Sequence, residues 1–211
     1  MLGPKDFKVK DKKCKECLII FTPQRPLQSV CSPKCAIAHN KMLEAKKEKK
    51  EWSKEKAVLK DKLKKLGDWK KDLQVEINTI VRLIDKGHPC ISSNSLNGKM
   101  NAGHYVGVKA HDSIRYNLHN IHIQSEYSNS YLSGDTLRYQ DGLRKVYGND
   151  YFERVESLRA TPLIKLSIND IVEKIATCRE IVRELKKVDL SYPAKIRIEL
   201  RESLNKRIGI Y

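Results

Sequence analysis

A chain of 211 residues with 40% hydrophobic and 7% aromatic side chains can form one or two domains, each with a modest core. No stretch approaches 18 consecutive apolar residues and the first 25 residues hold no apolar run that would direct secretion, which argues against a membrane-spanning protein and predicts a cytoplasmic location. The net charge of +16 indicates a polyanionic partner. The excess of Lys and Arg over Asp and Glu is 11 in residues 1–72 and 5 in residues 73–211, so the positive charge is concentrated in the first third.

Four cysteines near the start of the chain have the spacing of a metal site. The pairs Cys14-x2-Cys17 and Cys31-x3-Cys35 are separated by thirteen residues, beginning with the strand-like run 18–21. Two such pairs can bring four thiolates to one tetrahedral zinc ion. The alternative is two disulfides, but nothing else in the sequence suggests an oxidising compartment. We expect a zinc ribbon or treble-clef-like head over residues 1–40 with one structural zinc, whose binding contributes on the order of 10 kcal/mol to folding.

The segment after the cysteines is rich in Lys and Glu and predicts a basic helical linker over residues 41–67. Gly67 suits the end of this helix, and Asp68 suits the start of the next one. The second helix carries apolar residues at helical spacing from Trp69 to Ile84, so it should pack against a core. Charge runs on helices are usually solvated faces, but this one could also follow a DNA backbone by counterion release through Lys46, Lys47, Lys50 and Lys54.

The remainder of the chain predicts a small core and a helical tail. Residues 68–148 are expected to form this core, because residues 90–135 are rich in Gly, Asn and Ser and contain strand-like pieces at 104–106 and 121–124. Beyond Asp135, which suits a helix start, the pattern predicts helices at 136–147 and, in a C-terminal region 149–211, at 150–160, 168–188 and 193–207. The expected fold class is α+β and mostly α.

Three polar residues of the middle segment occur in the order used by single-metal ββα nucleases. His104 lies on one predicted strand, Asn120 precedes the second, and Asn129 follows it. A neutral imidazole can accept a proton from water near pH 7, and an Asn amide can hold that imidazole in place. An oxygen ligand at the start of the next helix can hold Mg²⁺ on the scissile phosphate. Taken singly, His104 and His122 would more often be structural, but their place in a polar loop of a basic protein favours catalysis.

Short motifs in the same order over about residues 10–147 support this interpretation. The chain resembles the NinG/Rap recombination endonucleases of lambdoid phages. The motifs that carry the resemblance are Cys14-Lys-Glu-Cys17, Phe21-Thr-Pro23, Gln28-Ser-Val-Cys31-Ser-Pro-Lys-Cys35, Pro89-Cys-Ile-Ser92, Ala102-Gly-His-Tyr105, Ile114-Arg-Tyr-Asn117, Asn120-Ile-His-Ile-Gln124 and Leu132-Ser-Gly-Asp135.

The resemblance implies an HNH-like ββα core and a structure-specific DNA endonuclease of a phage or prophage. Such an enzyme cuts Holliday junctions and other branched recombination intermediates, such as D-loops, by Mg²⁺-dependent phosphodiester hydrolysis. It implies that His104 is the general base, Asn120 its orienting residue and Asn129 a metal ligand, with His104 and Asn129 as the candidate Mg²⁺ site. His122 is a further candidate contact to metal or phosphate. Branched or single-stranded DNA is the expected partner, and homodimer formation is left open.

Two basic residues lie between the predicted strands. Arg115, beside Tyr116, could clamp a phosphate as a bidentate donor, and a surface salt bridge is the alternative. Lys109 in the same loop is a further candidate DNA contact.

The chain departs from the family pattern at several positions. Family members commonly carry a second zinc site of two Cys pairs around the hairpin, and here these positions are Cys90, Ser93, Ser125 and Ser128. Serine is a poor zinc ligand, so we expect no second zinc and a hairpin held by packing of Ile91, Ile121 and Ile123. Asn101 replaces a common acidic residue, and Tyr131 stands where related chains show His. These changes favour an alternative, a catalytically inactive zinc-containing DNA-binding accessory protein. An RNA-binding zinc protein is a third, weaker hypothesis.

Overall fold

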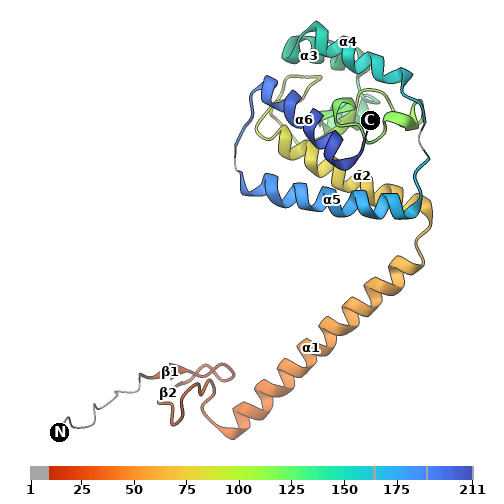
Figure 1. Cartoon of the computed structure of the whole chain (residues 1–211). Coiled ribbons are helices and arrows are strands. Elements are labelled where there is room, and N and C mark those ends of the chain that lie inside the picture. The colour runs from red at the N-terminus through yellow and green to blue at the C-terminus, as the bar shows by residue number, and fades with distance from the viewer. Residues whose placement is uncertain (1–9, 164, 189, 211) are drawn as a thin grey trace, which may run out of the picture. The chain divides into compact units, whose positions relative to one another are not determined.

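The chain forms two compact units, Met1–Leu63 and Lys64–Tyr211. The structure is a computed structural model that describes residues 10–163, 165–188 and 190–210. Both units are mainly helical, and each contains one two-stranded antiparallel sheet (Figure 1). The expected α+β, mostly α fold class is confirmed. In the part of the chain that the structure describes, no helix has the length and apolar character needed to cross a membrane.

The first unit consists of a short hairpin, the cysteine pairs and one long helix. Strands β1 (Lys12–Lys13) and β2 (Ile20–Phe21) pair antiparallel, with Lys12 opposite Phe21. Helix α1 (Pro33–Lys62) begins inside the second cysteine pair, because the Ser32 hydroxyl caps it by accepting from the Cys35 amide and Pro33 occupies its first turn. The basic helix therefore starts eight residues before the expected position. No residue of α1 is buried, so its lysines are all available to solvent.

Helix α2 (Leu66–Ile84) opens the second unit, and it begins earlier than expected. Gly67 lies in its first turn and does not end α1, while Asp68 accepts a hydrogen bond from the Lys65 amide in a capping box. The predicted apolar stripe is confirmed, since five of its residues are buried. Helix α5 (Ile168–Lys187) packs along α2 (Figure 1). Its buried stripe matches that of α2 and includes the Cys178 thiol.

A second hairpin lies against this helix pair. Strands β3 (Met100–His104) and β4 (Ile121–Ser125) pair antiparallel, with His104 opposite Ile121. The loop between them contains two 3₁₀ turns, η1 (Asp112–Ile114) and η2 (Leu118–Asn120). Ala102 and Ile121 belong to the core that α2 and α5 form. Ile91, Ile121 and Ile123 are all buried, and the Ile91 amide donates to the Ile123 carbonyl, so the expected packing of the hairpin is confirmed.

The remaining helices close the second unit around the hairpin. A π-helical turn η3 (Tyr127–Tyr131) follows β4 and leads to α3 (Thr136–Tyr147), α4 (Asn149–Ser157), η4 (Leu158–Ala160) and, after α5, α6 (Ala194–Ile208). Pro193 caps α6 and does not lie within its first turn. The segments expected as a nuclease core (68–148) and a separate C-terminal region (149–211) belong to one unit, because buried residues of α5 and α6 lie in the same core as those of α2 and β4.

Candidate functional site

The four cysteines of the first unit converge on one point. Their sulfur atoms all lie within 4.8 Å of one another, with Cys17 and Cys31 3.5 Å apart and Cys31 and Cys35 3.6 Å apart. Zinc bound tetrahedrally at about 2.3 Å from each sulfur requires sulfur separations of about 3.8 Å. The donor set therefore fits a tetrahedral ion after shifts of a few tenths of an ångström, and no disulfide is formed within the group.

Two thiols of this cluster have pKa values shifted in opposite directions. Burial opposes ionisation of Cys14, but backbone N–H groups of Cys17, Glu16 and Cys31 outweigh it and lower the pKa of Cys14 to about 6. The neighbouring Cys17 and Cys35 thiols raise the pKa of Cys31 to about 12. A divalent cation bound by the four sulfur atoms would favour the thiolate form of each.

In the second unit, His104 ends β3 with its ring held by a backbone carbonyl. Its Nε2 lies 2.9 Å from the Arg115 carbonyl oxygen. Because a carbonyl only accepts hydrogen bonds, the ring proton sits on Nε2 and Nδ1 remains the basic nitrogen. Burial, and then the positive charge of Arg115, lower the pKa of His104 despite the opposing effect of this hydrogen bond. The imidazole is therefore neutral at pH 7 and able to accept a proton.

Asn120 is buried and locks the loop that holds His104. Its Oδ1 accepts from the Val106 amide at 2.8 Å, and its Nδ2 donates to the carbonyls of Val106 at 3.1 Å and Ile114 at 3.3 Å. The next carbonyl along the chain, that of Arg115, is the one that binds His104. Asn120 contacts the loop backbone, not the imidazole, so any orienting effect on His104 acts through residues 106–115.

His122 lies in the interior, on the opposite face of the hairpin from His104. Burial lowers the pKa of His122 well below its usual value, and the Arg201 charge adds to this effect. Its Nδ1 and Nε2 are each 3.1 Å from a tyrosine hydroxyl, those of Tyr139 and Tyr151. With 1% of its surface exposed and both nitrogens engaged, His122 does not fit the expected contact to metal or phosphate. It is a satisfied core histidine.

The hydrogen bonds around His122 have one consistent direction. Tyr139 donates to the Gly103 carbonyl at 2.9 Å, so its oxygen accepts the Nδ1 proton of His122. The Nε2 of His122 then accepts from Tyr151, whose oxygen accepts the Nδ1 proton of His119 at 3.1 Å. This chain of neutral groups ends at the carbonyl of the residue before His104, and so it fixes the backbone of β3 at the candidate base.

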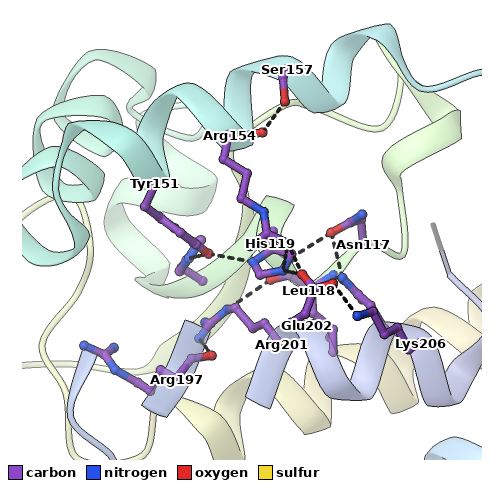
Figure 2. A network of polar contacts seen from close by, with 12 residues as sticks. Asn117, Leu118, His119, Tyr151, Arg154, Ser157, Arg197, Arg201, Glu202 and Lys206 are labelled. Atoms are coloured by element: carbon purple, nitrogen blue, oxygen red, sulfur yellow. Dashed lines mark hydrogen bonds and ion pairs between the residues drawn. The ribbon is translucent and has the colours of Figure 1, made fainter. Parts of the chain in front are cut away.

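Side chains of helix α6 form hydrogen bonds to the η2 turn, which contains Asn120 (Figure 2). The fully buried Arg201 donates to the carbonyls of Leu118 at 3.1 Å and Ile121 at 3.4 Å and pairs with Asp85 at 2.7 Å. Asn205 accepts from the Leu118 amide at 3.0 Å and donates to Asn117 at 3.0 Å. The turn is thereby bonded on both sides of Asn120.

Asp85 is the carboxylate that pairs with the buried arginines of α6. It is fully buried at the end of α2, pairs with Arg201 and with Arg197 at 3.2 Å, and accepts from the Ile123 amide at 3.0 Å. Burial would raise the pKa of Asp85, but the Arg201 charge and the smaller effects of His122 and Arg197 lower it to about 2. The carboxylate is therefore charged at neutral pH and joins α2, β4 and α6.

Of the side chains expected to contact DNA, Arg115 is bonded to other residues of the protein, whereas Lys109 and the lysines of α1 are exposed. The Arg115 guanidinium donates to Gln74 at 3.1 Å and lies 3.7 Å from Asp112, so the salt-bridge alternative describes it better than a free phosphate clamp. Lys109 is exposed in the loop. The exposed lysines of α1 include all four predicted there, Lys46, Lys47, Lys50 and Lys54.

The candidate metal ligand Asn129 lies in η3, half-buried, and no hydrogen bond joins it to His104 among the described residues. Asn101 is on β3 opposite Gln124, and Tyr131 is exposed. Within the described residues, the cysteine cluster is the only group of three or more His, Cys, Asp or Glu side chains close enough to share a metal. An ion near His104 would thus rely on amide, water and substrate oxygens.

Of the positions expected to match a second metal site in the family, Ser93 and Ser125 contact the Cys90 thiol, and Ser128 contacts Ser125. Burial would raise the pKa of Cys90, but hydrogen bonds from the Ser125 amide and from Ser93 lower it to about 7. The Ser93 amide lies 3.4 Å from the Cys90 sulfur, and the Ser128 amide donates to the Ser125 hydroxyl at 3.2 Å. Hydroxyl groups thus stand at three of the four positions, and Cys90 is the one thiol among them.

Comparison with known proteins identifies the family of the chain. The family model described as Bacteriophage Lambda NinG protein matches residues 6–189. The chain belongs to the NinG family. Protein ninG of Escherichia phage lambda is 33% identical over 166 residues, covering 69% of this chain and 80% of the relative. Those of Enterobacteria phage H19B and Salmonella phage P22 are 33% and 32% identical, with the same coverage. No solved structure matches.

The NinG match ends before α6, although α6 supplies Arg197, Arg201 and Asn205 to the hairpin. Sequence reasoning missed these residues because polar side chains on a helix normally mark its solvent face. The available signal was the i, i+4 spacing of Arg197 and Arg201, but such pairs are common on exposed helices too.

Proposed function

We propose that this NinG-family protein is a structure-specific endonuclease that hydrolyses phosphodiester bonds in branched DNA, such as Holliday junctions and D-loops. The observation that carries the proposal is His104, a neutral imidazole whose ring is fixed by the Arg115 carbonyl and whose loop is locked by Asn120. A fixed neutral base near the surface of a basic protein is what removal of a proton from attacking water requires.

The roles of the other residues follow from their positions. Asn120 keeps the loop 106–115 in one conformation, and Asn129 is the protein ligand for Mg²⁺, which often relies on few protein groups together with water and substrate phosphates. Such an ion supplies charge stabilisation at the scissile phosphate. His122 holds the hairpin from inside. The four-cysteine head binds one zinc and, with the exposed lysines of α1, contributes affinity for the DNA backbone.

The first test is cleavage of a labelled four-way junction by the full-length protein, with and without Mg²⁺. His104→Ala should lower the single-turnover rate by about 10²- to 10⁴-fold and leave junction binding intact, since only proton transfer is lost. His111→Ala, the same change at another loop histidine, serves as the control and should cleave like the wild type. Equal rates for wild type and His104→Ala would show that this site is not the nuclease centre.

The pH dependence gives an independent readout. The base acts only when neutral, and the pKa of His104 is lowered by burial. The cleavage rate should therefore fall only when the pH drops below the ordinary histidine range. An acid limb at or above the ordinary histidine pKa would contradict the assignment of His104 as a buried base.

The alternative function is a DNA-binding accessory protein without nuclease activity. Asn101 on β3, and the absence of a second cluster of metal-binding side chains among the described residues, favour it. In that case the wild type would bind junctions and cleave none of them with Mg²⁺ or Mn²⁺, while retaining the fold.

A further inference from the structure

Two exposed tyrosines stack on each other on the turn that follows β4. Tyr127 and Tyr131 are 63% and 77% exposed, and their ring centroids are 6.0 Å apart with the planes inclined by 27°. Among the described residues of the second unit, they are the only aromatic side chains with most of their surface in solvent. The tyrosines of the hairpin core, such as Tyr139 and Tyr151, are buried. The exposed pair therefore contributes little to this core.

The pair lies on the same short helix as the candidate metal ligand. Tyr127 and Tyr131 are four residues apart and share one face of η3, whereas Asn129, between them, points away from that face and is half-buried. The two sides of a helix are about 10 Å apart. One strand of DNA advances about 3.4 Å for each phosphate. If the scissile phosphate of a strand lies at Asn129, a nucleotide about three positions along the same strand would lie at the tyrosines.

The net charge of the second unit favours nucleic acid over an apolar partner. The unit Lys64–Tyr211 has seven more Lys and Arg than Asp and Glu. Beside the tyrosines themselves, Lys99, whose side chain is 69% exposed, forms an ion pair with Glu126, the residue before Tyr127, so the charge there is balanced. Aromatic side chains beside basic ones are the usual composition of surfaces that bind unpaired bases, because every base offers a stacking face and the backbone brings negative charge.

We infer that Tyr127 and Tyr131 form a stacking platform for an unpaired base at the branch point of a DNA substrate. Bases inside a continuous duplex are covered by their neighbours and cannot reach this surface, whereas a base at a fork or junction can leave the stack. The platform gives the protein a means to prefer branched over duplex DNA. It rests on the proposed function for its substrate, but it acts through binding and not through the chemistry of His104.

The test uses full-length His104→Ala protein, so that no DNA is cut. The probes are a splayed fork and a four-way junction with 2-aminopurine at successive positions from the branch, and a duplex of equal length. The double change Tyr127→Phe/Tyr131→Phe keeps both rings, and Tyr127→Leu/Tyr131→Leu removes them. Leu137→Ala, at a 77% exposed aliphatic position on α3, is the matched surface control.

The parent, the Phe variant and the Leu137→Ala control should quench 2-aminopurine at a position near the branch. The Leu variant should lose this quenching and bind the fork about 5- to 100-fold more weakly, with duplex affinity changed less than about twofold. Unchanged quenching and fork preference in the Leu variant would overturn the inference. So would a change only in the association state by sedimentation, which would show that the tyrosines join two copies of the chain.

This outcome can be separated from failure of the nuclease proposal. Cleavage is measured with His104 present, and stacking is measured with His104→Ala. A platform without cleavage would leave this inference standing for a binding protein, whereas cleavage with no effect of the Leu variant would refute the platform alone.

Discussion

Replacement of Arg201 by Met is the sharpest test of how the hairpin is held. Arg201 is fully buried and supplies Asp85 with its shorter ion pair, 2.7 Å against 3.2 Å for Arg197. Removing one partner of a buried pair costs about 3–5 kcal/mol, because the other charge is left without compensation. Met has a similar length and fills the volume, so the loss reflects charge and hydrogen bonding more than packing.

The pKa of Asp85 gives a second route to the magnitude. Its folded value of about 2 lies below the ordinary value of 3.8. A carboxyl whose pKa is lowered in the folded state stabilises the fold above its unfolded pKa, and this contribution disappears as the pH falls through the folded value. A shift of this size corresponds to about 2–3 kcal/mol at neutral pH. Because Arg197 remains as a partner, we expect a loss of about 3 kcal/mol.

The assay is urea unfolding of the full-length protein at pH 7 and at pH 4, monitored by a probe in the second unit. Arg201→Met should lower the free energy of unfolding at pH 7 by about 3 kcal/mol and by less at pH 4, because loss of Arg201 raises the folded pKa of Asp85 and protonation of this carboxyl then costs the variant less stability than the wild type. Glu199→Met, at an exposed position of the same helix, is the control. A loss below about 1 kcal/mol at pH 7, with no difference between the two pH values, would refute the reasoning.

The remaining predictions concern metal and charge. Elemental analysis of protein purified without chelator should give one zinc per chain, and a strong chelator should unfold the first unit while the second keeps its thermal transition; two zincs, or none, would contradict this. The triple change Ser93→Cys, Ser125→Cys and Ser128→Cys should raise the content to two zincs per chain, because Ser93 and Ser125 contact Cys90 and Ser128 contacts Ser125; a content of one would show that the four side chains do not converge on one ion. Deleting residues 1–63 should weaken binding to every DNA shape and reduce the slope of log affinity against log salt by about 0.9 for each lost phosphate contact, whereas an unchanged slope would mean that α1 is only solvated.

Sequence patterns predicted those parts of the fold that depend on local chemistry. The cysteine spacing predicted the cluster in the first unit, and the apolar stripes of α2 and α5 predicted the core between these two helices. Helix α3 has the bounds expected from Asp135 and Gly148. Local capping also explains why α1 begins earlier than predicted, since Ser32 and Pro33 form a helix start within the second cysteine pair.

The parts that sequence could not predict depend on contacts between distant residues. Nothing local to His122 distinguishes a core histidine from a ligand, because its partners Tyr139 and Tyr151 are 17 and 29 residues away. The buried polar side chains of α6 bond mainly to groups 80 or more residues earlier, such as Asp85, Asn117 and the Leu118 carbonyl. The catalytic roles of His104, Asn120 and Asn129 remain predictions that the cleavage assays address.

The hydrogen bonds between α6 and the η2 turn can form only late in synthesis, because α6 lies far behind the turn in the sequence. At about 5–20 residues per second, a ribosome needs about 4–17 s to pass from the end of β4 to the end of α6. During most of that interval the nascent chain contains the hairpin and the cysteine cluster, but neither Arg197 nor Arg201, so Asp85 lacks both of its ion-pair partners. The hydrogen bonds that hold the η2 turn can therefore form only after α6 has been synthesised, well after the strands themselves.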